Sequence, residues 1–322
     1  MKSLKLLVVL LAAAGAFTGA HAQKYPERPV TLVIPFPPGA STDAFGRLIA
    51  QRMALDLKQQ VVVVNRDGAA GVIGTNYVAR SAPDGYTLLW GTSSGLSIMP
   101  ALKRKLPYDP QRDFAPISLG AKVSWVLAVH PSVPASNVKE LVALAKRHPG
   151  KLNFASAGTG GAPHLAGELF KVTAGIDVMH IPYRGTALFA VDLVAGQVDY
   201  GFASPLTTLP FTRTGRLKAL AVTAPKRIDV YPDIPTMAEA GYPGFELTQW
   251  YAMLAPAGTP ANIIATLNAA VRNALTDATL IKRLAEDGGM PAPTTPEGLA
   301  QFIREETASY ARVAEKAGIK SE

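Results

Sequence analysis

The chain contains no cysteine among its 322 residues. This absence excludes a disulfide framework, thiolate metal sites and cysteine nucleophiles together. Histidine is scarce as well, at 5 residues, and the sequence has neither an HExxH motif nor a histidine pair on one helical turn. We therefore expect no zinc site and no other bound metal.

A long hydrophobic run is also missing. The apolar stretch Leu6–Ala14 is too short to span a bilayer, which needs ~20 residues. Two lysines precede it, and Ala20-His21-Ala22 after it forms an A-x-A cleavage site. This pattern predicts a secretory signal peptide over residues 1–22 and a mature chain from Gln23. Because no cysteine stands at the junction, we expect no lipid anchor and a protein that works outside the cytoplasmic membrane.

Charged residues are few, at 17% of the chain, with 32 basic against 24 acidic side chains. The lysines and arginines are dispersed, so the positive excess favours anionic ligands weakly and predicts no nucleic-acid partner. Hydrophobic residues make up 48%. A chain of this length and composition has room for about two folded domains.

Predicted strands alternate with predicted helices along the chain, and the alternation restarts near Ser124. This pattern indicates an α/β protein with two parallel sheets. The predicted strands are Val30–Ile34, Val61–Val64, Tyr86–Trp90, Ser124–Val129, Leu152–Ala155, Asp177–His180, Val198–Phe202, Leu217–Thr223 and Gln249–Ala255. Because Val61–Val64 is entirely β-branched, we expect it to be buried on both faces. Gln249–Ala255 is expected to return to the first lobe, and the helices opened by Pro260 and Pro296 are expected to pack there.

Two glycine-rich loops, each between a strand and a helix, are the strongest candidates for a binding site. The Pro-Gly loop (residues 35–43) precedes a helix that Thr42 or Asp43 can cap. The Ser-Gly loop (residues 156–161) leads into a helix with Pro163 at its first position. Such loops expose backbone N–H groups at the positive end of a helix dipole, which suits a carboxylate, phosphate or sulfate. The alternative is an ordinary connection whose glycines serve only for turning.

Several side chains near these loops have two possible roles. His164 is either a donor that contacts a ligand or braces the Ser-Gly loop, or a packed histidine with no such role. Arg184 either clamps a carboxylate or braces its own loop, and Asp199, ahead of Phe202, is either a structural cap or a ligand group. Ser136 matches an S-x-x-K pattern but is better explained as a helix cap, because the accompanying acyl-enzyme motifs are absent.

Gly91-Thr92-Ser93-Ser94-Gly95 matches the G-x-S-x-G nucleophile elbow and follows a predicted strand. Pro100 interrupts the place of the helix that should follow, and the last histidine, His180, comes too early for a triad. We therefore expect a polar loop at the end of a strand, where α/β folds bind ligands. Gly158-Thr159-Gly160 lacks the third glycine of a dinucleotide motif, since Pro163 stands there, so we expect no cofactor.

These motifs together resemble a known family, the extracytoplasmic solute receptors of the tripartite tricarboxylate transporters, also called the Bug family. The resemblance covers essentially the whole mature chain. The matching segments, in family order, are Pro35–Gly39 with Asp43, Asn65-Arg66 with Gly68 and Gly71, Pro83–Leu89, Leu106–Pro110 with Asp113-Phe114, Ser156, Gly158, Gly160, His164–Phe170, Pro182–Gly185, Gly196–Asp199, Ala219–Thr223 and Pro235-Thr236 with Glu239–Gly241.

The resemblance implies a periplasmic binding protein of the type II architecture, with two α/β lobes and a central ligand cleft. It implies lobe 1 over residues 23–124 plus 246–322 and lobe 2 over 125–245. A small carboxylate would be gripped between Gly39–Asp43 and Ser156–Gly160 by backbone amides, hydroxyls and bound water. The expected ligand-binding residues are Phe36, Gly39, Ala40, Ser41, Thr42, Asp43, Thr92, Ser93, Ser156, Ala157, Gly158, Thr159, Gly160, His164, Tyr183, Arg184, Gly185, Asp199 and Phe202.

The implied function is that of a monomeric receptor, not an enzyme, that passes its ligand to a two-component membrane permease. Two other functions remain open: a sensor that presents the carboxylate to a membrane histidine kinase, and a secreted hydrolase that uses Ser93. The chain departs from the usual family pattern at Ala40, Met99, Gly161 and Leu188. Because Ala40 and Gly161 lie in the two loops themselves, the ligand of one family member cannot simply be assigned to this chain.

Overall fold

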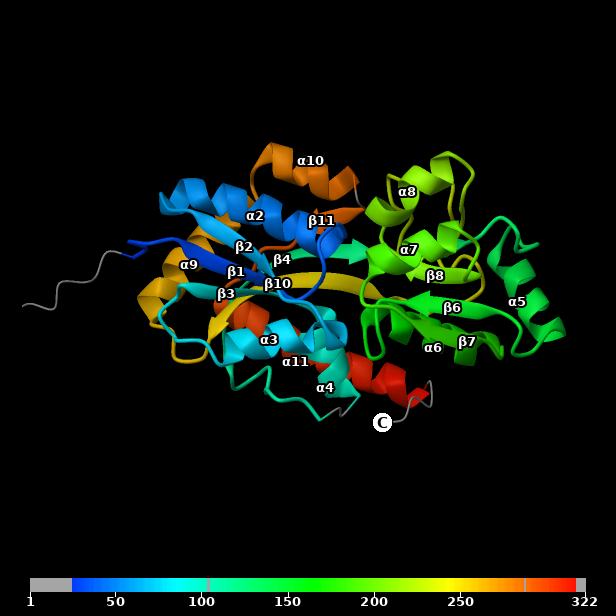
Figure 1. Cartoon of the computed structure of the whole chain (residues 1–322), viewed down its shortest axis with the longest axis horizontal. Helices are drawn as coiled ribbons and strands as arrows, with labels where there is room; N and C mark the ends of the chain where they lie inside the picture. The colour runs from blue at the N-terminus through cyan, green and yellow to red at the C-terminus, as the bar shows by residue number, and fades with distance from the viewer. Residues whose placement is uncertain (1–24, 103–104, 287, 317–322) are drawn as a thin grey trace, which may run out of the picture.

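The structure is a computed structural model that describes residues 25–102, 105–286 and 288–316. The predicted signal peptide lies outside these residues. Figure 1 shows two lobes side by side, each built on one β-sheet with helices on both of its faces. The first lobe holds a six-stranded sheet in the order β11-β4-β10-β3-β1-β2, and the second holds a five-stranded sheet in the order β7-β6-β8-β5-β9. The predicted α/β fold with two lobes is confirmed.

Both ends of the chain contribute to the first lobe. Its strands are β1 (Val30–Ile34), β2 (Val61–Asn65), β3 (Thr87–Thr92), β4 (Phe114–Ser124), β10 (Thr248–Pro256) and β11 (Gly289–Pro291). Its helices are α2 (Ser41–Leu57), the short η1 (Ala69–Gly71), α3 (Val72–Ala79), the π-helical η2 (Ser94–Ile98), α4 (Met99–Ala101), α9 (Ala261–Ala274), α10 (Ala278–Glu286) and α11 (Pro296–Lys316).

The second lobe is formed by one continuous part of the chain. Its strands are β5 (Val126–Val129), β6 (Asn153–Ser156), β7 (Met179–Pro182), β8 (Tyr200–Ala203) and β9 (Lys218–Val222). Its helices are α5 (Val138–Arg147), α6 (Ala162–Ala174), α7 (Thr186–Val194) and α8 (Pro205–Arg213). The predicted strand Ser124–Val129 is divided, because β4 ends in the first sheet at Ser124 and β5 starts the second sheet at Val126.

The expectation of wholly parallel sheets is wrong. The strands joined by helices are parallel, as in the pairs β1–β2, β1–β3, β6–β7 and β6–β8. In contrast, β10 runs antiparallel to both β3 and β4, and β5 runs antiparallel to both β8 and β9. The chain crosses between the lobes at β4–β5 and returns through β10, so the returning strand runs against its neighbours. Figure 1 shows β10 in yellow, with its arrow starting beside the second lobe and pointing into the first lobe.

Two other local expectations are also corrected. β2 lies at the edge of its sheet, and Val62 is 43% exposed, so this strand is not buried on both faces. β-branched residues suit any half-buried pleated surface, and composition therefore could not distinguish an edge strand from a central one. Helix α5 is capped by Asn137, whose side chain accepts a hydrogen bond from the backbone of Glu140, and not by Ser136.

The tail helices fix the first lobe and also reach the second. Leu267 and Val271 of α9 are buried in the first-lobe core, as expected. Leu299 of α11 packs against the other face of the same sheet, whereas Tyr310 further along α11 belongs to the core of the second lobe. Helix α11 therefore spans both lobes, as Figure 1 shows. Within the described ranges, no helix combines the length and the apolar character needed to cross a membrane.

Candidate ligand pocket between the lobes

A pocket of about 70 Å³ lies where the two lobes face each other. It is lined from both lobes and from the segments that join them. The lining residues are Phe36, Pro37, Pro38, Ala40, Thr42, Ser94, Trp125, Ala157, Gly161, Pro163, Gly185, Thr186, Ala187, Leu188 and Gln249. Among the described residues that line the pocket, none has a charged side chain. Five of the predicted ligand residues are in this set, namely Phe36, Ala40, Thr42, Ala157 and Gly185.

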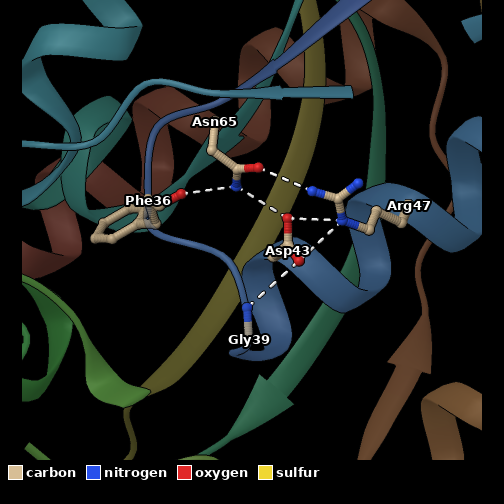
Figure 2. Close-up of polar contacts among 5 residues, drawn as sticks. All are labelled: Phe36, Gly39, Asp43, Arg47 and Asn65. Carbon is tan, nitrogen blue, oxygen red and sulfur yellow. Dashed lines mark hydrogen bonds and ion pairs between the residues drawn. The ribbon is translucent and has the colours of Figure 1, made fainter. Parts of the chain in front are cut away.

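The Pro-Gly loop is held by a cluster of charged and amide groups behind it (Figure 2). Arg47 Nε donates to both carboxylate oxygens of Asp43, at 3.0 and 2.9 Å. Asn65 Nδ2 donates to Asp43 Oδ1 and to the carbonyl of Phe36, both at 2.9 Å. The backbone N–H of Gly39 also donates to Asp43, at 3.4 Å. Asp43 therefore braces the loop, and its carboxylate faces these partners rather than a ligand.

These contacts also set the charge state of Asp43. Burial raises the pKa of this carboxyl, but the hydrogen bonds from Arg47 and Asn65 and the charge of Arg47 outweigh burial and leave its pKa below the ordinary value. Asp43 is thus ionised, and the Arg47 guanidinium compensates its charge. A bare carboxylate at this position would repel a bound anion.

Helix α2 starts next to the pocket without a side-chain cap. Its N-cap residue is Ala40, not Thr42 or Asp43 as expected, and no side chain caps it. The first N–H groups of a helix have no partner within the helix, and they lie at the positive end of its dipole. Ala40 and Thr42 line the pocket at this end, so the start of α2 offers amide donors to a ligand.

The Ser-Gly loop is braced by two histidines instead of charged groups. Ser156 Oγ and His180 Nε2 lie 2.7 Å apart and share a hydrogen bond. The N–H of Gly158 donates to Ser156 Oγ, and the N–H of Gly160 donates to His164 Nδ1 at 3.2 Å. The two imidazole rings are tilted against each other with centroids 4.3 Å apart. His164 therefore braces the loop, which was one of the two roles that the sequence allowed.

Burial keeps one of the two histidines neutral. Together with a smaller effect from the charge of Lys171, it lowers the pKa of His180 to about 4. His164 Nδ1 accepts from the N–H of Gly160, and its Nε2 lies 4.0 Å from Glu168 Oε1. His180 thus supports the Ser-Gly loop without adding charge near the pocket.

Helix α7 provides a third helix start at the pocket, of which the sequence analysis named only Gly185. Its N-cap is Gly185, again without a side-chain cap, and Gly185, Thr186, Ala187 and Leu188 all line the pocket. The sequence analysis drew attention to Arg184 instead. A glycine followed directly by a helix was the available signal. The starts of α2, α6 and α7 therefore converge on one pocket from the two lobes.

The floor of the pocket comes from the segments that cross between the lobes. Trp125 stands between β4 and β5, and Gln249 is the second residue of β10. Ser93 Oγ donates to Gln249 Oε1 at 3.0 Å and so orients the amide. Ser93, like Thr92, is buried and acts behind the lining residues. Sequence reasoning missed Trp125 and Gln249, because their position depends on how the two sheets are joined.

In the described part of the chain, two hydrogen bonds connect the lobes directly across the cleft. Ser41 Oγ donates to Ser204 Oγ at 2.6 Å, and the backbone N–H of Ala162 donates to Ser94 Oγ at 3.1 Å. The first bond links the start of α2 to the N-cap of α8, and the second links η2 to the start of α6. The lobes are therefore in contact beside the pocket.

Four of the expected ligand residues lie elsewhere. Asp199 exchanges hydrogen bonds with Asn153 at the start of β6, whereas the pocket lies at the other end of that strand. Phe202 is fully buried in the core of the second lobe. Arg184 is exposed and does not line the pocket. The hydroxyl of Tyr183 donates to Asp192 at 2.7 Å.

The remaining expected residues, Gly39, Ser41, Ser156, Gly158, Thr159 and Gly160, belong to the two loops or the first turn of α2 without lining the pocket. Gly39 has φ +95°, and Gly158 and Gly160 have φ +119° and +82°. These left-handed values favour glycine, because a Cβ would be strained there. Their role is to shape the loops. In the described ranges, no cluster of histidine and acidic side chains could hold a metal ion.

Comparison with known proteins identifies the family. Residues 45–319 match the family model described as the tripartite tricarboxylate transporter family receptor. The chain is 38% identical to protein BugT of Bordetella pertussis over 322 residues, which cover 98% of each chain.

Solved structures agree with the sequence comparison. The periplasmic binding protein BugD matches with a TM-score of 0.87 and 38% identity, over 92% of this chain and 99% of that one. Rpa4515 of R. palustris, solved with adipate, matches with a TM-score of 0.89 and 36% identity, over 92% and 99%. The predicted periplasmic-binding-protein fold and the resemblance are thus confirmed, and this chain belongs to the receptor family of the tripartite tricarboxylate transporters.

Proposed function

We propose that this protein is a periplasmic receptor that captures a small carboxylate between its lobes and delivers it to a two-component membrane permease of the tripartite tricarboxylate type. The observation that carries the proposal is the convergence of three helix starts on a pocket whose lining residues are uncharged. The starts of α2 and α7 supply N–H donors, and all three helix starts supply a positive dipole end, which favours an anion. The adipate in the related R. palustris structure supports a carboxylate as that anion.

The same proposal includes the organisation of the mature protein. The mature chain begins at Gln23 after signal-peptide removal and is free in the periplasm as a monomer. The lobe boundaries are residues 23–124 plus 246–322 and 125–245. The change of sheet between β4 and β5, and again before β10, supports them. Ligand binding then stabilises the lobes in contact, and the permease recognises that closed form.

Thermal unfolding with a panel of small molecules tests the proposal. The panel contains dicarboxylates, tricarboxylates, acidic amino acids and aromatic carboxylates, with neutral sugars and cations as controls. A ligand at ~100 times its dissociation constant adds about 2.7 kcal/mol if it binds only the folded state. We expect at least one carboxylate to raise the melting temperature by several degrees. A response only to sugars or cations would refute the proposed function.

Native mass spectrometry of freshly purified periplasmic protein provides a second test, because a tight receptor retains its ligand. We expect a bound carboxylate and a polypeptide mass that starts at Gln23 without lipid. Uptake assays in cells that lack the receptor, with and without the permease, then separate delivery to a transporter from presentation to a sensor kinase.

A further inference from the structure

Helix α7 is apolar on the side that faces solvent as well as on the side that it buries. The side chains that it buries in the second lobe are Phe189, Ala190 and Leu193. On the other side, Leu188 is 48% exposed and Val191 is 65% exposed. These two residues are three positions apart, so they are neighbours on one face of the helix. The one charged residue in α7 is Asp192, and its carboxylate accepts a hydrogen bond from the hydroxyl of Tyr183 at 2.7 Å.

The outer face of α7 is unusual for a surface helix. Such a helix normally carries charged or polar residues toward solvent, and a helix that is apolar all round is normally buried. Single exposed apolar side chains need no explanation, but adjacent ones that border a binding site mark a surface where another molecule docks. We therefore expect the outer face of α7 to be covered in one functional state of the protein.

The exposed face of α7 continues into the mouth of the pocket between the lobes. Leu188 lines this pocket, and so do Pro37 and Pro38 of the Pro-Gly loop, of which Pro38 is also exposed. The two sides approach closely, because a Cβ added to Gly185 would lie 3.3 Å from Cδ of Pro37. We call Pro37, Pro38, Leu188 and Val191 the apolar rim. Both lobes contribute to it, so the rim is complete only while the lobes are in contact.

The position of the apolar rim indicates what covers it. A receptor that captures its ligand from solution must leave the mouth of the pocket open, so a permanent cover such as a second copy of this chain would block capture. A partner that receives the ligand must instead sit at the mouth when the ligand leaves. The four rim residues are all uncharged, so covering them with apolar atoms removes apolar surface from water without burying a charge.

We infer that the apolar rim is a docking surface for the two-component membrane permease, and that Val191 is buried in the contact. The complementary surface is an apolar, uncharged patch on the periplasmic side of the permease, placed over the mouth of the pocket. Because both lobes contribute to the rim, docking distinguishes lobes in contact from lobes apart. This inference rests on the proposed function, because it requires a permease that receives the ligand.

A lysine placed at two exposed helical positions tests the inference. Val191→Lys puts a charge into the rim, and Leu55→Lys puts the same charge on α2, about 20 Å along the helix from Thr42 at the pocket. Leu55 is a matched control, because it is 62% exposed and differs little from Val191 in this respect. Neither residue lines the pocket.

The two variants should differ in delivery and agree in capture. Calorimetric titration with a carboxylate that stabilises the wild type should give both variants the wild-type affinity within about twofold, because the added charge is exposed and screened by salt. In cells that lack the native receptor, Val191→Lys should reduce permease-dependent uptake of the same radiolabelled carboxylate at least about tenfold, as expected for a charge placed in the centre of an interface. Leu55→Lys should support uptake at the wild-type rate.

Photo-crosslinking identifies the partner directly. Val191→benzoylphenylalanine and Leu55→benzoylphenylalanine are irradiated with membranes that contain the permease, in the presence of the same carboxylate. Mass spectrometry then identifies the crosslinked chain. We expect position 191 to crosslink to a permease subunit and position 55 to give no such product.

Several results would overturn the docking surface and leave carboxylate capture intact. They are wild-type uptake with Val191→Lys, an equal loss of uptake with Leu55→Lys, and a crosslink from position 191 to a second copy of this chain. If Val191→Lys loses carboxylate affinity by the same factor as uptake, the residue acts through the pocket, and the docking role is refuted. If the wild type binds a carboxylate but supports no permease-dependent uptake, delivery to a permease fails, and the inference fails with it.

Discussion

The two glycine-rich loops serve the same pocket but are braced by different chemistry. Behind the Pro-Gly loop, Asp43 and Arg47 form an ion pair joined by Asn65. Behind the Ser-Gly loop, His164 and His180 hydrogen-bond to Gly160 and Ser156. The first arrangement compensates charge by pairing Asp43 with Arg47, and in the second burial keeps His180 unprotonated. The attraction of the helix starts for an anion is therefore unopposed on both sides.

The largest effect is expected from replacing the glycines that shape the loops. Gly39→Val and Gly160→Val should each weaken carboxylate binding at least about a hundredfold, or ~2.8 kcal/mol. Both glycines have left-handed φ, at +95° and +82°, which valine adopts only with strain, so the amides would be turned away from the ligand.

The matched control for these variants is Gly215→Val, in the turn after α8. Gly215 also has left-handed φ, at +72°, with open space around it. This variant should lose stability in the same way but retain binding. Calorimetric titration, with circular dichroism to check folding, measures both. If folded Gly39→Val and Gly160→Val bind as well as Gly215→Val, the loops do not form the site.

The next effect comes from breaking the ion pair of the Pro-Gly loop. Arg47→Met should weaken binding about tenfold, or ~1.4 kcal/mol, because Asp43 becomes an uncompensated negative charge near the bound anion. Arg52→Met on the same helix is the control, since Arg52 pairs with Asp277 instead. Calorimetric titration measures both variants, and equal affinity in Arg47→Met and Arg52→Met would contradict the charge argument.

The stabilising contributions of His180 and Asp43 should be lost at different pH values. The pKa of His180 falls from 6.5 to about 4 in the folded state, so the unfolded chain binds more protons between these values. Stability from this histidine is complete above about pH 6.5 and is lost as the pH falls toward 4. Asp43 also has a lowered pKa, so its contribution is lost only below its unfolded value of about 3.9.

We therefore expect the first acid-induced weakening, between pH 6.5 and 4, to arise in the second lobe. Urea unfolding of the wild type and His180→Gln over this range provides the measurement. The variant should be less stable at pH 7 but depend less on pH. An identical pH dependence in the two proteins would show that His180 is not the titrating group.

The smallest effect is expected at Ser93. Ser93→Ala removes one neutral hydrogen bond to Gln249 and should change affinity by no more than about tenfold, or ~1.4 kcal/mol. Binding measured by calorimetry should persist with the same ligand order. Complete loss of binding would show that the pocket floor depends on Ser93 far more than one hydrogen bond allows.

Local features of the site could be predicted from the sequence, and long-range features could not. A strand, a glycine-rich turn and a helix start are consecutive in the chain, so both loops were identified from residues alone. The partners of Asp43 include Asn65, 22 residues away, and proximity in sequence does not reveal such a pairing. Asp199 hydrogen-bonds to Asn153 at the end of β6 that lies away from the pocket, and the sequence does not show which end of the sheet faces the cleft.

Trp125 and Gln249 illustrate the same limit. Both residues line the pocket only because the chain leaves the first lobe after β4 and returns through β10, which pairs with β4. The start of α7 was overlooked for a different reason. Its glycine was visible, but the neighbouring Arg184 offered a familiar way to bind a carboxylate and drew the interpretation toward a charged clamp.

The central claim is that helix-start amides, and not a charged side chain, hold the ligand carboxylate. The most direct test is a ¹H–¹⁵N correlation spectrum of the labelled protein titrated with the carboxylate that stabilises it. The account predicts the largest downfield shifts at the backbone amides of Thr42, Thr186 and Ala187, with Arg184 Nε unmoved. Large shifts at Arg184 Nε, with these amides unchanged, would contradict it and establish an arginine clamp.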